Sequence, residues 1–374
     1  MAFLKKIVIF IAVAVFAIAL FVSFNVTYAS DFILTILAKD KSYTFTNSEI
    51  ALYNGKYYLK NAKEIVEGIY LDTLKNCKDA SVKFNPNSEI LFTYTNEVSG
   101  EELIKEALLN EIENALNSGK NSVVAKYREI KPKINVQDLK KETNFRVSFT
   151  TNYSYSNIDR KYNIQLASKK INGIILDNGE EFSFNKIVGL RTEENGFKNA
   201  KVIFNGDYVD GVGGGVCQVS TTLYNTALLS GLLITEHHPH SLQVSYVEPS
   251  FDAMVNSVSS DLKFINNTGG RLYIKSVADF NNVTISFYGI KQNEKYDRVS
   301  VVVEETACNE YLYEDDNDIN FGDKVIVRIP KNGVSSEGYL IKYENGVEIK
   351  NSRIRCDYYN PIKGIIKVGK KLTN

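Results

Sequence analysis

The alternation of apolar and polar positions divides the chain into four stretches, of which the first is the most distinct. Lys5 and Lys6 precede an uncharged apolar run over residues 7–24, about long enough to cross a bilayer. Because the two lysines would stay in the cytoplasm, the remainder of the chain is expected outside it. We therefore predict a single-pass membrane anchor within residues 1–30. The alternative is a signal peptide cleaved before Ser30, which would give a secreted protein.

Residues 31–142 alternate stretches rich in β-branched and aromatic residues with amphipathic stretches, and this alternation predicts an α+β domain. Asn54-Gly55 has the chemistry of a hairpin turn. The first helix is expected to bury Ile65, Ile69 and Leu71 on its apolar side. The predicted elements are strands over 35–45, 57–59 and 90–94, and helices over 63–74 and 101–117.

Residues 143–290 carry a second α+β pattern. Asp159 is expected to cap a helix with Tyr162, Leu166 and Ala167 inward. Apolar and polar side chains alternate over 240–246, which predicts a strand with His240 near its start. The predicted elements are helices over 160–171 and between Gly215 and Gly231, and strands over 145–150, 240–246, 261–265, 271–277 and 283–288.

Residues 291–374 contain short strand-like stretches separated by turn residues, among them Gly322, Asn332-Gly333 and Asn345-Gly346. This pattern predicts a small all-β module. The whole chain is thus expected to be α+β, in four parts. They are an anchor or signal segment over 1–30, an α+β domain over 31–142, a second α+β domain over 143–290 and the β module over 291–374.

The charge composition narrows the range of partners. The 374 residues include 44 Lys and Arg against 44 Asp and Glu, a formal net charge of +0. Proteins that bind nucleic acid need clustered positive charge to meet the phosphates. We therefore expect no nucleic-acid partner.

Candidate chemistry is concentrated between Gly211 and Asp252. Four glycines fall within residues 211–215, and all three histidines of the chain follow. Cys217 lies in the first turn of the predicted helix, where unpaired N–H groups and the positive end of the helix dipole favour a thiolate. The sequence therefore predicts a reactive cysteine.

His240 and Asp252 could complete a catalytic set with this cysteine. An imidazole can take the thiol proton, and a carboxylate can fix the ring tautomer. The order Cys217, His240, Asp252 is similar to that in transglutaminase-like and papain-like cysteine enzymes, in order of elements alone. We hypothesise a cysteine-dependent amidase or acyltransferase without a cofactor, with main-chain N–H groups after Gly215 as oxyanion donors.

Two other interpretations stay open. His238 and His240 form a His-x-His pair that, with Cys217, could bind a zinc ion. Alternatively, the glycine loop binds a carboxylate through its main-chain N–H groups and performs no chemistry. The glycines of that loop are Gly213, Gly214 and Gly215.

Four blocks of sequence occur in order over roughly residues 147–279: TTNYSYSNIDRKYNI, GEEFSFNKIVGLRT, GGGVCQVSTTLYN and HPHSLQVSYVEPSFDA. Together they resemble the VanW family, named for an accessory protein of vancomycin-resistance clusters. One departure is Pro249-Ser250-Phe251, where the family usually has Pro-Gly before the aspartate. The tail from Cys356 resembles a small β module, named for its glycines, that often ends envelope proteins.

The resemblance implies a cell-envelope protein with a YoaR-like peptidoglycan-binding region ahead of the VanW domain. Its expected partner is peptidoglycan or another wall polymer, although the N-terminal region could equally be a spacer. Arginine can bind a carboxylate bidentately, which would suit a wall stem peptide, and an ordinary ion-pair role is the alternative. The candidate ligand-binding residues outside the glycine loop are Arg160, Asn163, Arg191, Gln218, Ser220 and His238.

The remaining cysteines predict one disulfide. Cys308 and Cys356 both lie in the C-terminal module, and an extracytoplasmic location would permit a bond between them. Such a bond would contribute about 4 kcal/mol in the chain-entropy model. The alternative is two unpaired thiols. Either way Cys217 stays free, as a catalytic role requires, and Cys77 is expected to be a small buried side chain.

Overall fold

The computed structural model describes residues 32–204 and 206–371. The anchor or signal predicted over 1–30 lies outside these residues. Within the described part of the chain, no helix combines the length and the apolar character needed to cross a membrane. Contacts divide the chain into two units: the first runs to Lys78 and includes Val98–Lys133, and the second comprises Asp79–Glu97 and everything from Ile134 onward.

The first unit has the α+β architecture that its pattern predicts. Strand β1 pairs antiparallel with β2 and parallel with β8, and the helices pack against these strands and each other. Its elements are β1 (Leu34–Ala38), β2 (Lys41–Phe45), β3 (Ile50–Tyr53), β4 (Lys56–Leu59), α1 (Ala62–Thr73), β7 (Gly100–Leu103), α2 (Lys105–Asn117), β8 (Ser122–Val124) and β9 (Tyr127–Ile130).

Local chemistry explains most of this unit. Asn54 and Gly55 both have positive φ and join β3 to β4, which confirms the predicted hairpin turn. The prediction for α1 was wrong at Leu71, which is 65% exposed, whereas Val66 is 1% exposed. Val66, Ile69 and Thr73 follow the helical repeat on the buried face, and Leu71 falls outside that repeat.

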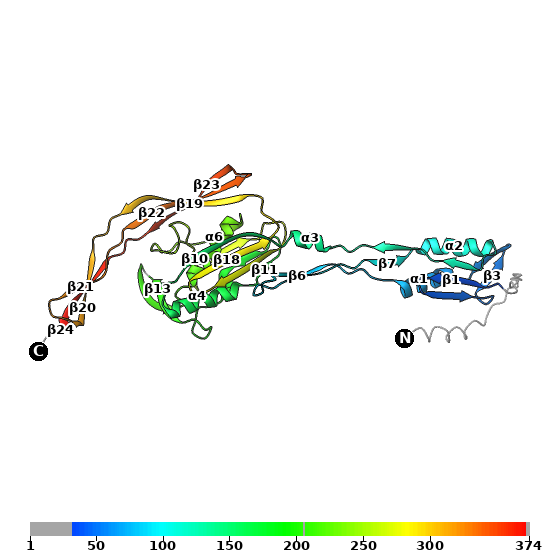
Figure 1. The fold of residues 1–374 in the computed structure, drawn as a ribbon, viewed down its shortest axis with the longest axis horizontal. Coiled ribbons are helices and arrows are strands. Elements are labelled where there is room, and N and C mark those ends of the chain that lie inside the picture. The colour runs from blue at the N-terminus through cyan, green and yellow to red at the C-terminus, as the bar shows by residue number, and fades with distance from the viewer. Residues whose placement is uncertain (1–31, 205, 372–374) are drawn as a thin grey trace, which may run out of the picture. The chain divides into compact units, whose positions relative to one another are not determined.

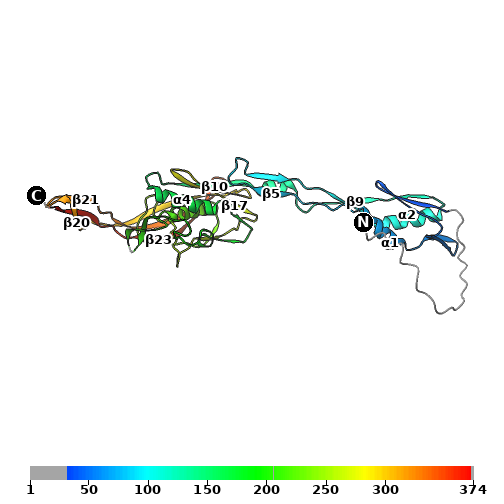
Figure 2. The same cartoon turned by 90° about the horizontal axis from the view of Figure 1, so that it is seen from below.

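The second unit is built around the antiparallel sheet β10–β18–β17–β11, with α4 and α6 packed on one face (Figures 1 and 2). Alternate residues of β18 are buried, including Val283, Ile285 and Phe287. The strands are β10 (Asn144–Asn152), β11 (Ile175–Leu176), β17 (Leu272–Ala278) and β18 (Asn282–Gly289), and the helices are α4 (Ile158–Ile171) and α6 (Val216–Leu229).

The opposite face of the sheet is covered by the hairpin of β5 (Ser81–Phe84) and β6 (Phe92–Thr95). The Phe92 ring makes edge contacts with Tyr273 and Tyr288, at centroid distances of 5.1 and 5.8 Å. This hairpin falls within the N-terminal stretch of the sequence pattern, yet it packs with the second unit. Long-range aromatic packing of this kind has no local signal.

Two smaller β elements and two short helices complete the α+β part of this unit. Strand β16 pairs with both β12 and β15, and β13 pairs with β14. The helix predicted over 160–171 is present, but Asn157, not Asp159, is its cap, and Tyr162 is 41% exposed. The elements are α3 (Val136–Lys141), β12 (Glu181–Ser183), α5 (Phe184–Val188), β13 (Asn199–Phe204), β14 (Asp207–Val212), β15 (Leu233–Glu236) and β16 (Lys263–Ile265).

The strand predicted over 240–246 does not form. Residues between β15 and β16 are irregular, although burial still alternates over 241–245, with Leu242 and Val244 buried. The main-chain N–H of His240 donates to a side chain, Asp252, at 2.6 Å. The apolar alternation was real, but the segment has no neighbouring strand with which to form a ladder.

The C-terminal region is all β, as predicted. It contains the sheets β19–β22–β23 and β20–β24–β21. The strands are β19 (Lys295–Thr306), β20 (Tyr311–Asn320), β21 (Lys324–Arg328), β22 (Gly333–Glu344), β23 (Val347–Tyr359) and β24 (Gly364–Lys371).

The predicted disulfide in this region was wrong, because Cys308 and Cys356 are both free. Cys308 Sγ lies 3.6 Å from the main-chain oxygen of Ile362. Cys356 is exposed on β23, opposite Glu337 of β22. The two thiols therefore have different neighbours, which separation along the sequence could not reveal.

Candidate functional site

Cys217 lies in the first turn of α6, as its sequence context predicts. Gly215 caps the helix with φ 105°, a conformation that favours glycine, and Gly231 follows the helix end with φ 68°. The sulfur faces a large cavity and lies 3.3 Å from the main-chain oxygen of Val255, to which the thiol form donates. The helix start thus places the sulfur at the wall of the cavity.

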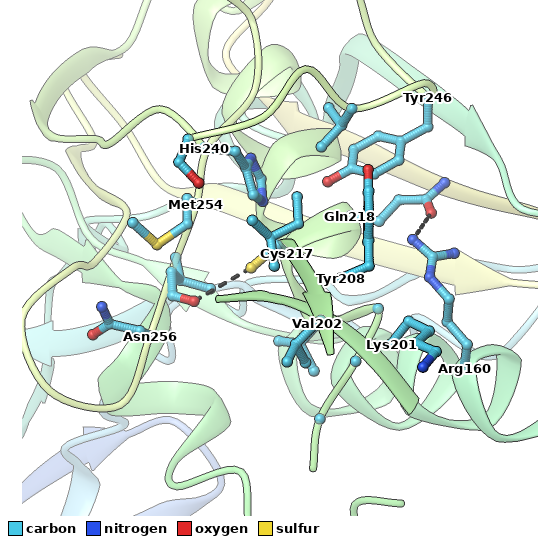
Figure 3. Close-up of a pocket in the computed structure, with 18 of the residues that line it drawn as sticks. Arg160, Lys201, Val202, Tyr208, Cys217, Gln218, His240, Tyr246, Met254 and Asn256 are labelled. Carbon is cyan, nitrogen blue, oxygen red and sulfur yellow. Dashed lines mark hydrogen bonds between the residues drawn. The ribbon is translucent and has the colours of Figure 1, made fainter. Parts of the chain in front are cut away.

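His240 reaches the same cavity from the irregular segment after β15, and its ring lies over Cys217 (Figure 3). Its Nδ1 atom is 2.7 Å from Asp252 Oδ2, and the same oxygen accepts the His240 main-chain N–H. His240 is 5% exposed and Asp252 1% exposed. With Nδ1 held by the carboxylate, Nε2 is the ring nitrogen left for the sulfur.

Electrostatics favour an ion pair between the sulfur and the ring. Burial raises the pKa of the Cys217 thiol, but a hydrogen bond with His240 and the charge of that ring outweigh it, so the pKa lies below the ordinary value. Burial opposes the charged imidazole, yet its bonds to Asp252 and Cys217 raise the His240 pKa to about 9. Despite its burial, Asp252 has a lowered pKa because His240 and Arg355 stabilise its charge.

The C-terminal region holds Asp252 from the side opposite His240. Tyr359 Oη donates to Asp252 Oδ1 at 2.6 Å, and Arg355 lies 3.5 Å from the same oxygen. Arg355 also donates to the main-chain oxygen of Asp252 and ion-pairs with Asp357 at 2.9 Å. Sequence reasoning missed Arg355 and Tyr359, which are more than 100 residues from Asp252 and belong to a separate stretch of the pattern.

The departure at Ser250 has a structural explanation. Ser250 has φ 65°, the left-handed conformation that the glycine of the family pattern would adopt freely. Its main-chain N–H donates to Tyr359 Oη at 2.7 Å, and its hydroxyl bonds to Ser336 Oγ at 2.7 Å. Contacts from the C-terminal region therefore hold the serine in the turn that leads to Asp252.

The cavity beside Cys217 has a volume of about 1390 Å³. Ordinary small-molecule pockets hold about 300–1,000 Å³, so this one has room for a peptide or a larger wall fragment. Tyr208 and Tyr246 lie between Cys217 and Arg160 in the view of Figure 3. Burial holds the pKa of Tyr246 well above its usual value, so this phenol stays protonated and able to donate.

Comparison with known proteins agrees with this architecture. Residues 159–288 match the family model "VanW like protein", residues 298–371 the model "G5 domain", and residues 18–125 the model "Putative peptidoglycan binding domain". The chain carries a VanW-like domain. The resemblance seen in the four sequence blocks is confirmed, and the cysteine, histidine and aspartate described above all lie inside the VanW-like match.

Two curated relatives match part of the chain. It is 37% identical over 140 residues to "Uncharacterized protein YoaR" of Bacillus subtilis, covering 37% of this chain and 46% of that protein. It is 28% identical over 140 residues to "Vancomycin B-type resistance protein VanW" of Enterococcus faecalis, covering 36% of this chain and 50% of that protein. The chain thus spans about half the length of these relatives. The peptidoglycan-binding and VanW-like domains together associate it with the cell wall.

Six of the predicted ligand residues of the VanW-like domain line the cavity: Arg160, Arg191, Gln218 and the loop glycines Gly213, Gly214 and Gly215. Arg160 donates to Gln218 Oε1 at 2.9 Å (Figure 3). The Gln218 amide in turn donates to Asn152 O at 2.9 Å, and the side chain is 1% exposed. Gln218 therefore orients Arg160 at the edge of the cavity.

Two other predicted ligand residues are structural. Asn163 is fully buried, and its amide donates to Lys198 O and Gly214 O while its oxygen accepts from Lys198 N. Ser220 is equally buried and donates to Cys217 O and Ala253 O. These bonds hold the glycine loop and the segment after Asp252, and they leave neither side chain free for a ligand.

His238 points away from the sulfur and pairs with Glu236 at 3.0 Å. Within residues 32–204 and 206–371, no group of three or more His, Cys, Asp or Glu side chains could hold a metal ion. The alternative zinc set of Cys217, His238 and His240 is therefore not assembled, because a neighbouring carboxylate holds His238.

The Gly213 N–H of the glycine loop donates to Lys198 O at 3.0 Å, so this donor already has a partner. A Cβ on Gly214 would lie 2.6 Å from Lys201 O, so this glycine allows close packing against β13. The loop therefore contributes space and backbone shape to the site.

The pH dependence of thiol alkylation tests the ion pair. We expect iodoacetamide to alkylate Cys217 rapidly at pH values well below 9.0, the ordinary thiol pKa, because His240 favours the thiolate. In His240→Ala the inflection should move upward, since the hydrogen bond and charge of the ring no longer offset the burial of the thiol. Peptide-resolved mass spectrometry would measure the rates. His238→Ala is the control and should keep the wild-type profile; equal profiles in wild type and His240→Ala would contradict the pairing.

Proposed function

We propose that the VanW-like domain catalyses acyl transfer on wall peptides, with Cys217 as nucleophile, His240 as acid and base, and Asp252 as the group that orients the ring. The observation that carries this proposal is the arrangement around the imidazole. The carboxylate binds Nδ1 at 2.7 Å, and the imidazole lies beside the sulfur and lowers the thiol pKa. Cys217 and His240 line a cavity large enough for a peptide, and Asp252 lies buried behind the ring.

The reaction would proceed in two halves. The Cys217 thiolate attacks the carbonyl carbon of an amide, and a C–S bond forms. The C–N bond then breaks, and the leaving amine takes the proton from the His240 imidazolium, which leaves a thioester. A second amine or a water molecule attacks the thioester, gives its proton to His240 and releases the thiolate. An amine acceptor makes a new amide, whereas water completes a hydrolysis.

The helix start would stabilise the oxyanion. Val216 N–H and Gln218 N–H donate to the carbonyls of Gly213 and Gly215. The N–H of Cys217 lies between these two in the same turn, and we assign it as an oxyanion donor together with the positive end of the α6 dipole. Of the main-chain N–H groups after Gly215 that the sequence offers as oxyanion donors, we therefore propose that of Cys217.

The accompanying domains support a wall peptide as the substrate class. The peptidoglycan-binding match covers most of the first unit, so the same chain that holds the candidate active site also carries a wall-association domain. When one domain of a chain binds the wall, the reaction site on the same chain meets its substrate at a higher effective concentration. No cofactor is needed for this chemistry.

Mass spectrometry of the acyl-enzyme tests the proposal. Protein incubated with muramidase-released wall fragments, then acid-quenched, should carry a peptide adduct whose added mass equals the mass of the substrate minus the mass of the leaving amine. Peptide mapping should place the adduct on Cys217, and Cys77, Cys308 and Cys356 serve as internal controls. An adduct on no cysteine, with turnover also absent, would leave the chain as a wall-binding protein without chemistry.

A further inference from the structure

Two arginines face the cavity that contains Cys217. Arg160 extends from α4, and Arg191 follows α5. Burial lowers the pKa of both guanidinium groups. Since the ordinary arginine pKa is above about 12, both remain charged. The cavity therefore holds two positive charges that have lost part of their hydration.

Their hydrogen bonds go to neutral partners. Arg160 donates to Ser156 Oγ at 2.6 Å and to Gln218 Oε1 at 2.9 Å. Arg191 donates to Asn185 Oδ1 at 2.6 Å. A guanidinium carries five N–H donors, so both groups keep donors for a ligand.

Two other buried arginines of this unit have carboxylate partners, whereas Arg146 bonds to the neutral groups of Ser230, Ile290 and Gln292. Arg298 pairs with Glu248 at 2.9 Å, and Arg355 pairs with Asp252 and Asp357. Across residues 32–204 and 206–371, by contrast, no ion pair within 4.0 Å includes Arg160 or Arg191. Asp261 acts on Arg191 through its charge alone, while its oxygens accept from Ser183 and Asn185.

The glycine loop sets the position of both arginines. A Cβ on Gly213 would lie 2.8 Å from Arg191 Cβ, and one on Gly215 would lie 2.9 Å from Arg160 Cγ. The side-chain stems therefore pack directly on the loop that leads into Cys217. Any larger residue at either glycine would push a guanidinium away from the sulfur.

We propose that Arg160 and Arg191 form a carboxylate-binding subsite beside Cys217, so that the substrate carries a free carboxylate near the carbonyl that the sulfur attacks. The placement near that carbonyl rests on the proposed acyl transfer. Planar guanidinium groups bind carboxylates through paired hydrogen bonds, and peptide stems of the wall carry such groups. Arg191 also stabilises the thiolate through its charge, so the test separates binding from reactivity.

Binding is measured by calorimetry on the full chain carrying Cys217→Ser, which removes the thiolate and prevents turnover. The probes are a synthetic stem pentapeptide of alanine, glutamate, lysine and two alanines with free carboxylates, and the same peptide with every carboxylate amidated. We expect the free peptide to bind about 10- to 100-fold more tightly. Arg160→Gln and Arg191→Gln should each abolish most of that preference. Arg271→Gln, which removes an exposed positive charge paired with Asp177, should retain it.

Equal affinity for the two peptides, or an unchanged preference in both glutamine variants, would overturn the subsite. If a glutamine variant fails to fold, Arg160→Lys and Arg191→Lys keep the charge and the stem, and they should lose part of the preference because the paired donors are gone. A failure of the subsite can be distinguished from a failure of the proposed acyl transfer. A thioester on wild-type Cys217 that forms equally fast with the amidated peptide refutes the subsite alone, whereas a carboxylate preference without any adduct refutes acyl transfer alone.

Discussion

Cys217→Ser is expected to reduce acyl transfer by about 10³-fold or more. The thiol has a lowered pKa and forms a thiolate beside His240, whereas a serine hydroxyl is a much weaker acid and does not ionise there. The substitution exchanges one atom at a partly buried position in the first turn of α6, so the fold should persist. Binding to isolated cell walls should be almost unchanged, because most of the peptidoglycan-binding match lies in the other unit. Turnover and wall pull-down would be measured on the same preparations.

Cys77→Ser is the matched control for that experiment. It removes another free thiol, in the first unit, and should leave turnover at the wild-type level. Retained activity in Cys217→Ser would eliminate the nucleophile and with it the proposed mechanism. Loss of wall binding in Cys217→Ser would instead indicate that the sulfur belongs to a binding surface.

Asp252→Asn should have the second largest effect, on both activity and stability. An amide in this position can donate to Nδ1, which would turn the His240 ring to the tautomer that cannot accept the thiol proton, and we expect a loss of about 10⁴-fold in the acylation rate. His240, Arg355 and Tyr359 would also lose their buried counter-charge, at a cost of about 3 kcal/mol in the free energy of unfolding. Single-turnover acylation and urea denaturation would measure the two effects.

The stability loss should depend on pH in a defined direction. Asp252 has a folded pKa below its ordinary value of 3.8, so its stabilising contribution is present above that value and disappears as pH falls through the lowered folded pKa. Wild type and Asp252→Asn should therefore converge in strongly acidic solution. Asp177→Asn, at an exposed ion pair with Arg271, should change stability by less than about 0.5 kcal/mol. A similar loss in both variants would show that Asp252 has no special role.

Part of the candidate site could be predicted from rare residue types and local geometry. A glycine run followed by an amphipathic helix predicts a helix start, and this places Cys217 in its first turn. His240 and Asp252 were identified by their scarcity and order in the sequence. The reason given for His240 was wrong, since it lies on an irregular segment and not on a strand. Asn163, Ser220 and His238 looked equally available in the sequence, and only their bonding partners show that they are occupied.

By itself, the sequence determined the α+β pattern, the helix that carries Cys217 in its first turn, its glycine start and the turns of the β regions, because these depend on neighbours within a few residues. Tertiary structure alone decided which polar groups meet. It brought Arg355 and Tyr359 to Asp252 across more than 100 residues, packed the β5–β6 hairpin on the second unit and left Arg160 and Arg191 without an acidic partner. Burial and ion pairing are properties of groups distant in sequence, so no local pattern encodes them.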